Sequence, residues 1–283
     1  MAVLAGCSAE PPAPSPARSA EASPSPSPSP SPSPSPSPSP TPSPSPAPLT
    51  DGVSAGRELA AVETAIRSPA TPAESLPTLG RRQQILYRTL VANPAWRADA
   101  LAQLPAELVE VARANIEAGE QLRALTRPRT ELPAWRIVEP PPADELLAHY
   151  REAEREFGIP WQYLAAIHLV ESRLGRIRGT SPAGAQGPMQ FLPSTWAQYG
   201  RGDINSARDS ILAAGRYLRA AGAPANMDRA LYAYNHSDRY VRAITLYARQ
   251  MIESERAWLG YYHWQVFYRT TGGDVELPVG YGA

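Results

Sequence analysis

Proline occupies every second position from Pro24 to Pro48, and this run decides which part of the chain can fold. Residues 8–49 are otherwise mostly Ser and Ala, with only three charged side chains among them. Such a segment has too little apolar surface to offset the entropy lost on ordering, and dense proline favours an extended polyproline spacer. We therefore predict that residues 8–49 are a disordered linker and that the fold is confined to the residues after it.

A short motif precedes this linker. Leu4-Ala5-Gly6-Cys7 places an aliphatic residue and two small residues before a cysteine, which resembles the lipobox at which bacterial lipoproteins are cleaved and lipidated. Only six residues stand before Cys7, without the basic and apolar regions of a signal peptide. We interpret residues 1–7 as a truncated lipoprotein signal with Cys7 as the lipidation site; the alternative is a coincidental match at a cytosolic N-terminus.

Charge and composition exclude several classes of partner. The chain has 27 basic and 27 acidic residues, interspersed, so its formal net charge is zero and no basic patch suggests binding to nucleic acid. A single cysteine excludes a disulfide framework. No apolar run of about 18 residues is present, so we expect membrane attachment only through a lipid on Cys7. The location expected is extracytoplasmic, either anchored at the outer face of the cytoplasmic membrane or secreted to the cell wall.

Residues 50–135 have the periodicity of α-helices. Apolar residues recur at spacings of three and four after Pro105, and the windows 59–66 and 76–92 show the same pattern. No cluster of acidic or basic side chains in this region suggests chemistry. We predict a small helical region that packs on, or positions, the domain after it.

Residues 136–283 are predicted to form the second folded part. Helices are expected over 144–157, over 161–173, from Pro193, over 211–218, from Asp228, and from Asp238 to about Trp258. Ser206 and Asp209 have the spacing of a capping box before the fourth of these helices. Near the C-terminus, Gly272-Gly273-Asp274 separates two β-prone segments and predicts a β-hairpin.

Glu171 is the side chain that most needs an explanation. It lies near the end of the helix predicted over 161–173, whose other positions are almost all apolar, so burial should favour its protonated form. A carboxylic acid kept neutral at the edge of a cleft can protonate the leaving oxygen of a glycosidic bond. The alternative is a polar helix end paired with Arg173, Arg176 or Arg178. The 31 residues after Glu171 contain no Asp or Glu, so the adjacent loop supplies no second carboxylate.

Three segments together carry a resemblance to a known family. They are Glu171-Ser172, Ser181-Pro182-Ala183-Gly184-Ala185-Gln186-Gly187-Pro188-Met189-Gln190 and Ala233-Tyr234-Asn235. Their order and spacing resemble the signature of lytic transglycosylases with a soluble-lytic-transglycosylase (goose-lysozyme-like) catalytic domain, over about residues 144–251. The family's usual Gly-Leu-Met-Gln is here Gly-Pro-Met-Gln. The resemblance implies a mostly α-helical, lysozyme-like domain that acts on peptidoglycan.

The resemblance also implies roles for individual residues. Glu171 would be the single catalytic acid and base, cleaving the β-1,4 bond between N-acetylmuramic acid and N-acetylglucosamine and leaving a 1,6-anhydromuramoyl product. The substrate-binding residues implied are Ser172, Ser181, Gly187, Met189, Gln190, Tyr234 and Asn235. Tyr234 matches the family's tyrosine that faces the catalytic acid, so we expect it to hydrogen-bond Glu171 or the sugar. Peptidoglycan glycan strands are the expected partner, with no cofactor, and we expect a monomer.

Simpler structural explanations exist for the same residues. Gly184 and Gly187 allow a sugar to approach the backbone closely, but they also suit a tight turn. Gln190 offers a donor and an acceptor to an acetamido group, but it also suits a helix cap. Tyr234 could equally be a core tyrosine. Only the combination of these residues favours the functional interpretation.

Two other functions are compatible with the sequence. One is a hydrolytic muramidase in which Asp203 or Asp238 activates water, and the other is a catalytically silent wall-binding module. The retention of Glu171 together with Ser181, Gln190 and Tyr234 argues against the silent module. Asp203-x-Asn205 begins like a calcium loop, but Ala207 replaces the third ligand, so we predict no metal site. The aromatic residues from 258 to 268 are predicted to pack in the core rather than to stack on sugars.

Overall fold

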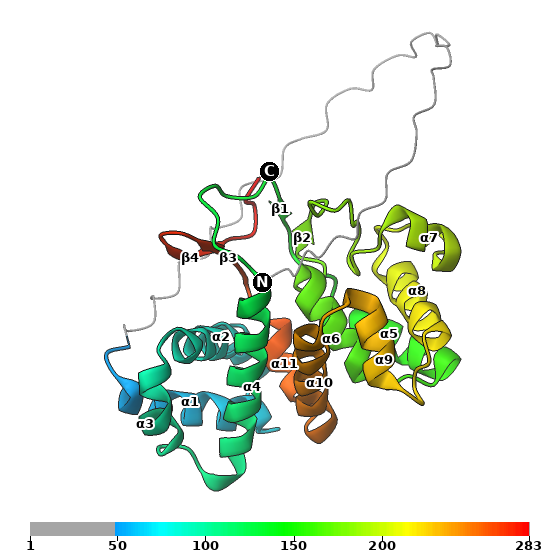
Figure 1. Cartoon of the computed structure of the whole chain (residues 1–283). Coiled ribbons are helices and arrows are strands. Elements are labelled where there is room, and N and C mark those ends of the chain that lie inside the picture. Colours follow the sequence, from blue (N-terminus) through cyan, green and yellow to red (C-terminus); the bar gives the residue numbers. More distant parts are fainter. Residues whose placement is uncertain (1–48, 283) are drawn as a thin grey trace, which may run out of the picture. The chain divides into compact units, whose positions relative to one another are not determined.

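The computed structural model describes residues 49–282. Cys7 and the linker residues 8–48 lie outside the described residues, so the predictions made for them stay predictions. The described residues are mainly helical, and their strands form only short antiparallel pairs (Figure 1), which confirms the predicted fold class. None of the helices within 49–282 is both long and apolar enough to cross a membrane.

Helices are the main elements of the described chain, and the longest stretch between two elements is residues 179–192. The helices are α1 (Gly52–Arg67), α2 (Leu76–Ala92), α3 (Arg97–Leu101), α4 (Ala106–Leu125), α5 (Ala143–Phe157), α6 (Trp161–Ser172), α7 (Pro193–Tyr199), α8 (Ala207–Ala220), α9 (Met227–Asn235), α10 (Asp238–Glu253) and α11 (Ala257–Tyr262). Single 3-10 turns, η1 (Ala73–Ser75) and η2 (Pro94–Trp96), precede α2 and α3. The strands are β1 (Arg136–Ile137), β2 (Ile177–Arg178), β3 (Val266–Thr270) and β4 (Gly273–Leu277).

The prediction of one helix from Asp238 to about Trp258 is wrong at the C-terminal end. The chain forms α10 up to Glu253 and begins a second helix, α11, at Ala257. The backbone of Ser254 is extended, with φ −146° and ψ 108°, and it separates α10 from α11. α11 then packs on α2, where two glycines let the backbones approach closely. A Cβ added to Gly80 would lie 2.6 Å from the carbonyl oxygen of Gly260. This packing on α2 is a long-range contact that the helical periodicity does not reveal.

Helix α10 joins the first helices of the fold to the later ones. It packs against α4 on one side and against α6 on the other, and Figure 1 shows it between them. A single hydrophobic cluster extends from Leu59 in α1 to Trp258 in α11. The helices of residues 50–135 therefore share a core with those that follow, while the domain boundary near residue 135 stays a prediction.

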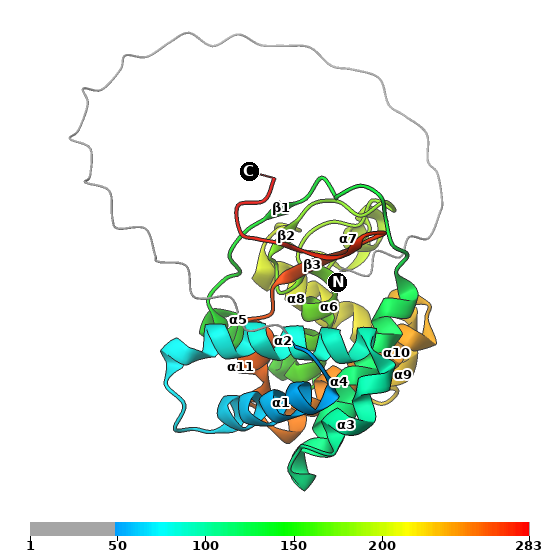
Figure 2. The ribbon, with the colours of Figure 1, turned by 90° about the vertical axis from the view of Figure 1, so that its left-hand side faces the viewer.

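Two antiparallel strand pairs complete the fold. β3 and β4 form the predicted C-terminal hairpin, with Val266 opposite Leu277. Figure 2 shows this hairpin above α2. β1 and β2 were not predicted, and they place Arg136 opposite Arg178. Of the aromatic residues between 258 and 268, those buried in the core as predicted are Trp258, Tyr261 and Trp264.

Candidate active site

Glu171 lies in the last turn of α6, a helix in which ten of the 12 residues are buried. The chain leaves this helix through Arg173 (φ 54°) and Leu174 (φ 60°), both left-handed, followed by Gly175 (φ 82°). This conformation is unfavourable for residues that carry a side chain, so the turn must be held by its surroundings. The N–H groups of Arg173 and Leu174 both donate to the carbonyl of His168. The turn therefore ends α6 sharply, immediately after Glu171 and Ser172.

The carboxyl group of Glu171 is almost completely removed from water. The residue is 3% exposed, and its Oε1 accepts a hydrogen bond of 2.7 Å from the hydroxyl of Tyr240. Burial raises the pKa of Glu171 to about 8, although the hydrogen bond from Tyr240 acts in the opposite direction. The group is consequently mostly protonated at neutral pH, which is the state expected from the apolar sequence around it.

None of the three nearby arginines pairs with Glu171, so the alternative interpretation of a charged, paired helix end is wrong. Their guanidinium groups have other contacts: Arg173 with the Trp264 ring (5.7 Å to its centre), Arg176 with Glu139 (3.0 Å) and Arg178 with the Asn205 carbonyl (3.3 Å). Within residues 49–282, no ion pair involves Glu171 and no second carboxyl group is hydrogen-bonded to it.

Ser172 and Ser181 organise the loop that follows α6. The Ser172 hydroxyl donates to the Pro188 carbonyl at 2.5 Å and accepts from the Gly175 N–H at 3.0 Å. The Ser181 hydroxyl oxygen accepts the N–H groups of two residues of its own turn, Ala183 and Ala185. Both serines are buried. They hold the glycine-containing segment against the end of the helix that carries Glu171.

Gly187 and Gln190 both have positive φ angles, of 72° and 52°. A Cβ on Gly187 would lie 2.1 Å from the Ile204 carbonyl oxygen, so only glycine fits there. The Gln190 amide nitrogen donates to the Gly187 carbonyl at 2.9 Å. The other amide atom of Gln190, Oε1, is buried and has no hydrogen-bond partner within residues 49–282. Gln190 thus retains a buried acceptor that a substrate N–H or hydroxyl could satisfy.

We expected the Tyr234 hydroxyl to hydrogen-bond Glu171 or the sugar, but it is not hydrogen-bonded to Glu171. The Tyr234 hydroxyl donates to the carbonyl of Met189 at 2.7 Å, and Met189 itself is fully buried. The Tyr234 ring is parallel to that of Tyr240, at 4° and with 6.3 Å between ring centres. Tyr240, and not Tyr234, therefore provides the hydroxyl that contacts Glu171. Asn235 ends α9 and is half-buried.

Tyr240 is a candidate site residue that no motif in the sequence indicated. It occupies the first turn of α10 and is spaced with Ala243, Ile244 and Tyr247 as part of a buried stripe. In the sequence such a tyrosine is indistinguishable from one that packs in the core. Its role becomes visible only because α10 lies against α6.

In the loop that begins like a calcium site, the carboxylates of Asp203 and Asp209 accept hydrogen bonds from backbone N–H groups of the same loop. Asp203 Oδ1 accepts from the Asn205 N–H at 2.9 Å, and the Asp203 N–H donates to Asp209 Oδ2 at 3.0 Å. Ser206 caps α8 as predicted, but Asp209 does not complete the box because its carboxylate is directed to Asp203. No group of three His, Cys, Asp or Glu side chains suited to a metal ion is present in residues 49–282.

Comparison with known proteins matches the part of the chain that contains this site to a described family. Residues 149–254 match the family described as Transglycosylase SLT domain. A membrane-bound lytic murein transglycosylase F from Thiobacillus denitrificans is 42% identical over 74 residues, which are 26% of this chain and 16% of that protein. The protein of the same name from Nitrosospira multiformis is 34% identical over 123 residues, which are 41% of this chain and 26% of that protein. No solved structure matches the chain.

The chain therefore covers about a quarter or less of the length of these two curated relatives. The family match begins within α5 and ends just after α10, so it includes all the residues that form the candidate site. Helices α1 to α4 and the β3–β4 hairpin lie outside the match.

Proposed function

Residues 149–254 are a transglycosylase SLT domain, and from this premise we propose that the chain is a peptidoglycan lytic transglycosylase with Glu171 as its single acid and base. The bond cleaved is the β-1,4 bond between N-acetylmuramic acid and N-acetylglucosamine. The observation that carries the proposal is a buried carboxyl group whose pKa is raised to about 8 by burial and whose hydrogen-bond partner is a neutral tyrosine.

The first step is donation of the Glu171 proton to the glycosidic oxygen, which releases the N-acetylglucosamine side as an alcohol. A carboxyl group that stays protonated at neutral pH suits this role. As the bond breaks, positive charge develops at the anomeric carbon of the muramoyl sugar. No second carboxyl group contacts Glu171 within residues 49–282, so we assign stabilisation of that charge to the substrate's own 2-acetamido oxygen.

Gln190 is the residue suited to orient this acetamido group. Its Oε1 has no partner in the described part of the chain, and it can accept the acetamido N–H while the amide nitrogen stays bound to Gly187. Fixing the acetamido group places its oxygen opposite the leaving group, which lowers the entropy cost of the intramolecular attack.

The second step returns the proton to Glu171. The ionised carboxylate accepts the proton of the 6-hydroxyl of the same muramoyl sugar, whose oxygen then attacks the anomeric carbon and closes the 1,6-anhydro ring. The Tyr240 hydroxyl stabilises the carboxylate between the two steps by donating to Oε1. The proton balance closes, and water is not consumed.

Mass spectrometry of a digest of purified peptidoglycan tests the proposal. We expect muropeptides that weigh one water less than those from a lysozyme digest and that resist reduction by borohydride, because an anhydro end has no free aldehyde. Glu171→Gln should yield no products. Reducing muramic acid ends alone would instead identify a hydrolytic muramidase, and the absence of any cleavage by the unmodified protein would identify a wall-binding module.

The proposed activity requires access to the cell wall. We infer an extracytoplasmic location, with a lipid on Cys7 as the anchor and residues 8–49 as the spacer between membrane and wall. An extended polyproline segment rises about 3.1 Å per residue, so a spacer of this length is long enough to carry the domain well away from the membrane.

A further inference from the structure

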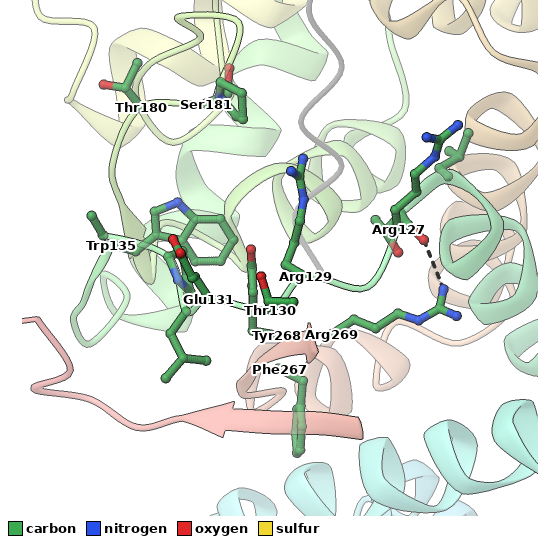
Figure 3. A pocket seen from close by; sticks show the side chains of 16 residues that line it. Arg127, Arg129, Thr130, Glu131, Trp135, Thr180, Ser181, Phe267, Tyr268 and Arg269 are labelled. Atoms are coloured by element: carbon green, nitrogen blue, oxygen red, sulfur yellow. Dashed lines mark hydrogen bonds between the residues drawn. The ribbon is translucent and has the colours of Figure 1, made fainter. Parts of the chain in front are cut away.

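A cavity of about 790 Å³ lies between the connector that follows α4 and strand β3 (Figure 3). Its lining includes most of residues 125–135, three successive residues of the loop at Thr180–Pro182, and three side chains of β3. Neither Glu171 nor Tyr240 lines it. Ser181 does, so the cavity adjoins the loop of the proposed sugar cleft. Its volume is in the range of small-ligand sites.

The walls of this cavity are fixed by hydrogen bonds. The connector pairs with the hairpin, because the Arg129 N–H donates to the Arg269 carbonyl at 3.1 Å and the Thr271 N–H donates to the Arg129 carbonyl at 2.9 Å. The guanidinium of Arg269 donates in turn to the carbonyls of Arg123 and Thr126, at 3.0 and 2.9 Å. The connector and strand β3 therefore form one preorganised surface.

Helices α2 and α4 hold the hairpin itself in place. Arg81 binds Glu276 through two hydrogen bonds, of 3.1 and 2.7 Å. Asp274 at the start of β4 is bound by both Arg88 and Arg123. The helical region that precedes the SLT domain thus positions the floor of the cavity.

The cavity carries positive charge that the protein does not neutralise. Arg127 and Arg129 are exposed, and Figure 3 shows both side chains rising from the connector. Neither guanidinium group forms an ion pair or a hydrogen bond within residues 49–282. Glu131 is the one acidic side chain among the described residues that line the cavity. Unpaired guanidinium groups suit carboxylates, which they can bind through two parallel hydrogen bonds.

An aromatic wall lies beside these arginines. The rings of Trp135 and Tyr268 meet edge to face, with 5.4 Å between their centres. Trp135 is mostly buried and also contacts the backbone at Gly179, where a Cβ would lie 2.7 Å from its ring. A rigid aromatic surface next to free cations is suited to an extended ligand with both apolar and anionic groups.

We propose that this cavity binds the carboxylate-bearing stem peptide of peptidoglycan. The identity of the ligand rests on the proposed function. The stem peptide branches from the muramic acid, the sugar at which cleavage is proposed, and Ser181 belongs both to the loop of the sugar cleft and to the cavity wall. A glycan in the cleft can therefore extend its peptide toward Arg127 and Arg129. The first four helices and the hairpin then serve substrate selection.

Binding of a synthetic stem peptide without sugar tests this inference directly. The peptide is titrated into the full chain at low ionic strength, with isothermal titration calorimetry as the readout. We expect saturable binding that weakens with added salt, because charges near the surface are screened. The double variant Arg127→Gln/Arg129→Gln should bind at least about tenfold more weakly, since each charge-assisted hydrogen bond lost costs enough to account for such a change.

A charge-matched double variant, Arg113→Gln/Arg219→Gln, serves as the control because both arginines are exposed and lie outside the cavity. It should bind the peptide as the unmodified protein does. A peptide with every carboxyl group amidated should bind the unmodified protein only weakly. Its affinity should match that of the acidic peptide for Arg127→Gln/Arg129→Gln, the cavity variant. Equal affinity of the acidic peptide for the cavity variant and the unmodified protein would overturn the inference.

The two proposals fail separately. Peptide binding needs no turnover, so it can be present in a protein that forms no anhydro product. Conversely, the unmodified protein and the cavity variant could cleave peptide-free glycan chains at the same rate while neither binds the peptide. That result would leave the proposed function intact and exclude the peptide site. For peptide-bearing glycan we expect the cavity variant to raise KM while kcat stays unchanged.

Discussion

The Tyr240 hydroxyl donates a 2.7 Å hydrogen bond to Oε1 of Glu171, and it joins the first turn of α10 to the last turn of α6. Burial favours the neutral acid, whereas this hydrogen bond favours the carboxylate, and the pKa of Glu171 is about 8 as the result. In the proposed mechanism Glu171 gives a proton and then takes one back, and each step is favoured by one of these two influences.

Removing the Tyr240 hydroxyl should therefore change the pH dependence of the reaction. In the unmodified protein, kcat/KM should fall as the pH rises through about 8, because Glu171 loses the proton that the proposed mechanism requires it to donate. In Tyr240→Phe the carboxylate loses a stabilising donor, so this decline should move to higher pH, and kcat should drop about tenfold or more. Tyr234→Phe is the matched control because its hydroxyl donates to Met189, and its decline should stay near pH 8. Identical profiles for the two variants would contradict the assignment of Tyr240.

Glu171 should make the fold less stable as the pH rises. Its pKa is about 8 in the folded chain and near 4.5 when unfolded, so between these values the unfolded chain has fewer bound protons than the folded chain. The contribution of Glu171 to the free energy of unfolding is therefore fully present below about pH 4.5, and it is lost progressively as the pH rises to about 8. Glu171→Gln cannot ionise and keeps an acceptor for Tyr240.

At pH 8.5, Glu171→Gln should unfold at a higher denaturant concentration than the unmodified protein. Its free energy of unfolding should be larger by up to several kcal/mol. The difference should shrink steadily toward pH 4.5. Urea unfolding at intervals across this range measures it, and a difference that does not depend on pH would argue against a buried, protonated Glu171.

Gly187 and Gly184 allow a matched comparison within one loop. Both have positive φ, 72° and 84°, but a Cβ on Gly187 meets the Ile204 carbonyl at 2.1 Å whereas nothing lies within 4 Å of one on Gly184. Gly184→Ala should cost about 1–2 kcal/mol through backbone conformation alone. Gly187→Ala should cost more and should also reduce activity, since the loop must move away from Ile204. Thermal unfolding and turnover assays of the two variants test this difference.

Asp274 should contribute measurably to stability because it binds two arginines at once. Arg88 and Arg123 both contact its carboxylate, which is 20% exposed. Asp274→Asn leaves two cations without their partner, so we expect a loss of about 2–3 kcal/mol. The exposed pair of Glu110 and Arg113 provides the control, and Glu110→Gln should change stability by less than about 1 kcal/mol. Similar effects of the two substitutions would show that the hairpin is not anchored by Asp274.

The anchor prediction concerns Cys7. Expressed behind a complete lipoprotein signal, the protein should carry a lipid on Cys7 and fractionate with membranes, whereas Cys7→Ala should be neither processed nor lipidated. Detergent partition and intact-mass measurement distinguish the two forms. Equal membrane association without lipid in both forms would exclude the anchor.

The sequence by itself predicted most of the helices and singled out Glu171 as the candidate acid. Periodic apolar residues predict helices because an amphipathic stripe must be buried, and the predicted range 76–92 coincides with α2. The apolar residues around Glu171 favoured a neutral carboxyl group, because desolvation by neighbours along the same helix is a local property, but they left a charged helix end paired with an arginine as the alternative.

Tertiary structure decided what depends on contacts between distant segments. Tyr240 reaches Glu171 only because α10 packs on α6, and α11 separates from α10 where it meets α2. The cavity at Arg129 likewise requires the connector to pair with a hairpin about 140 residues further along the chain. Spacing in a sequence records which side chains share a face of one element. Which faces meet is set by the packing of the whole core.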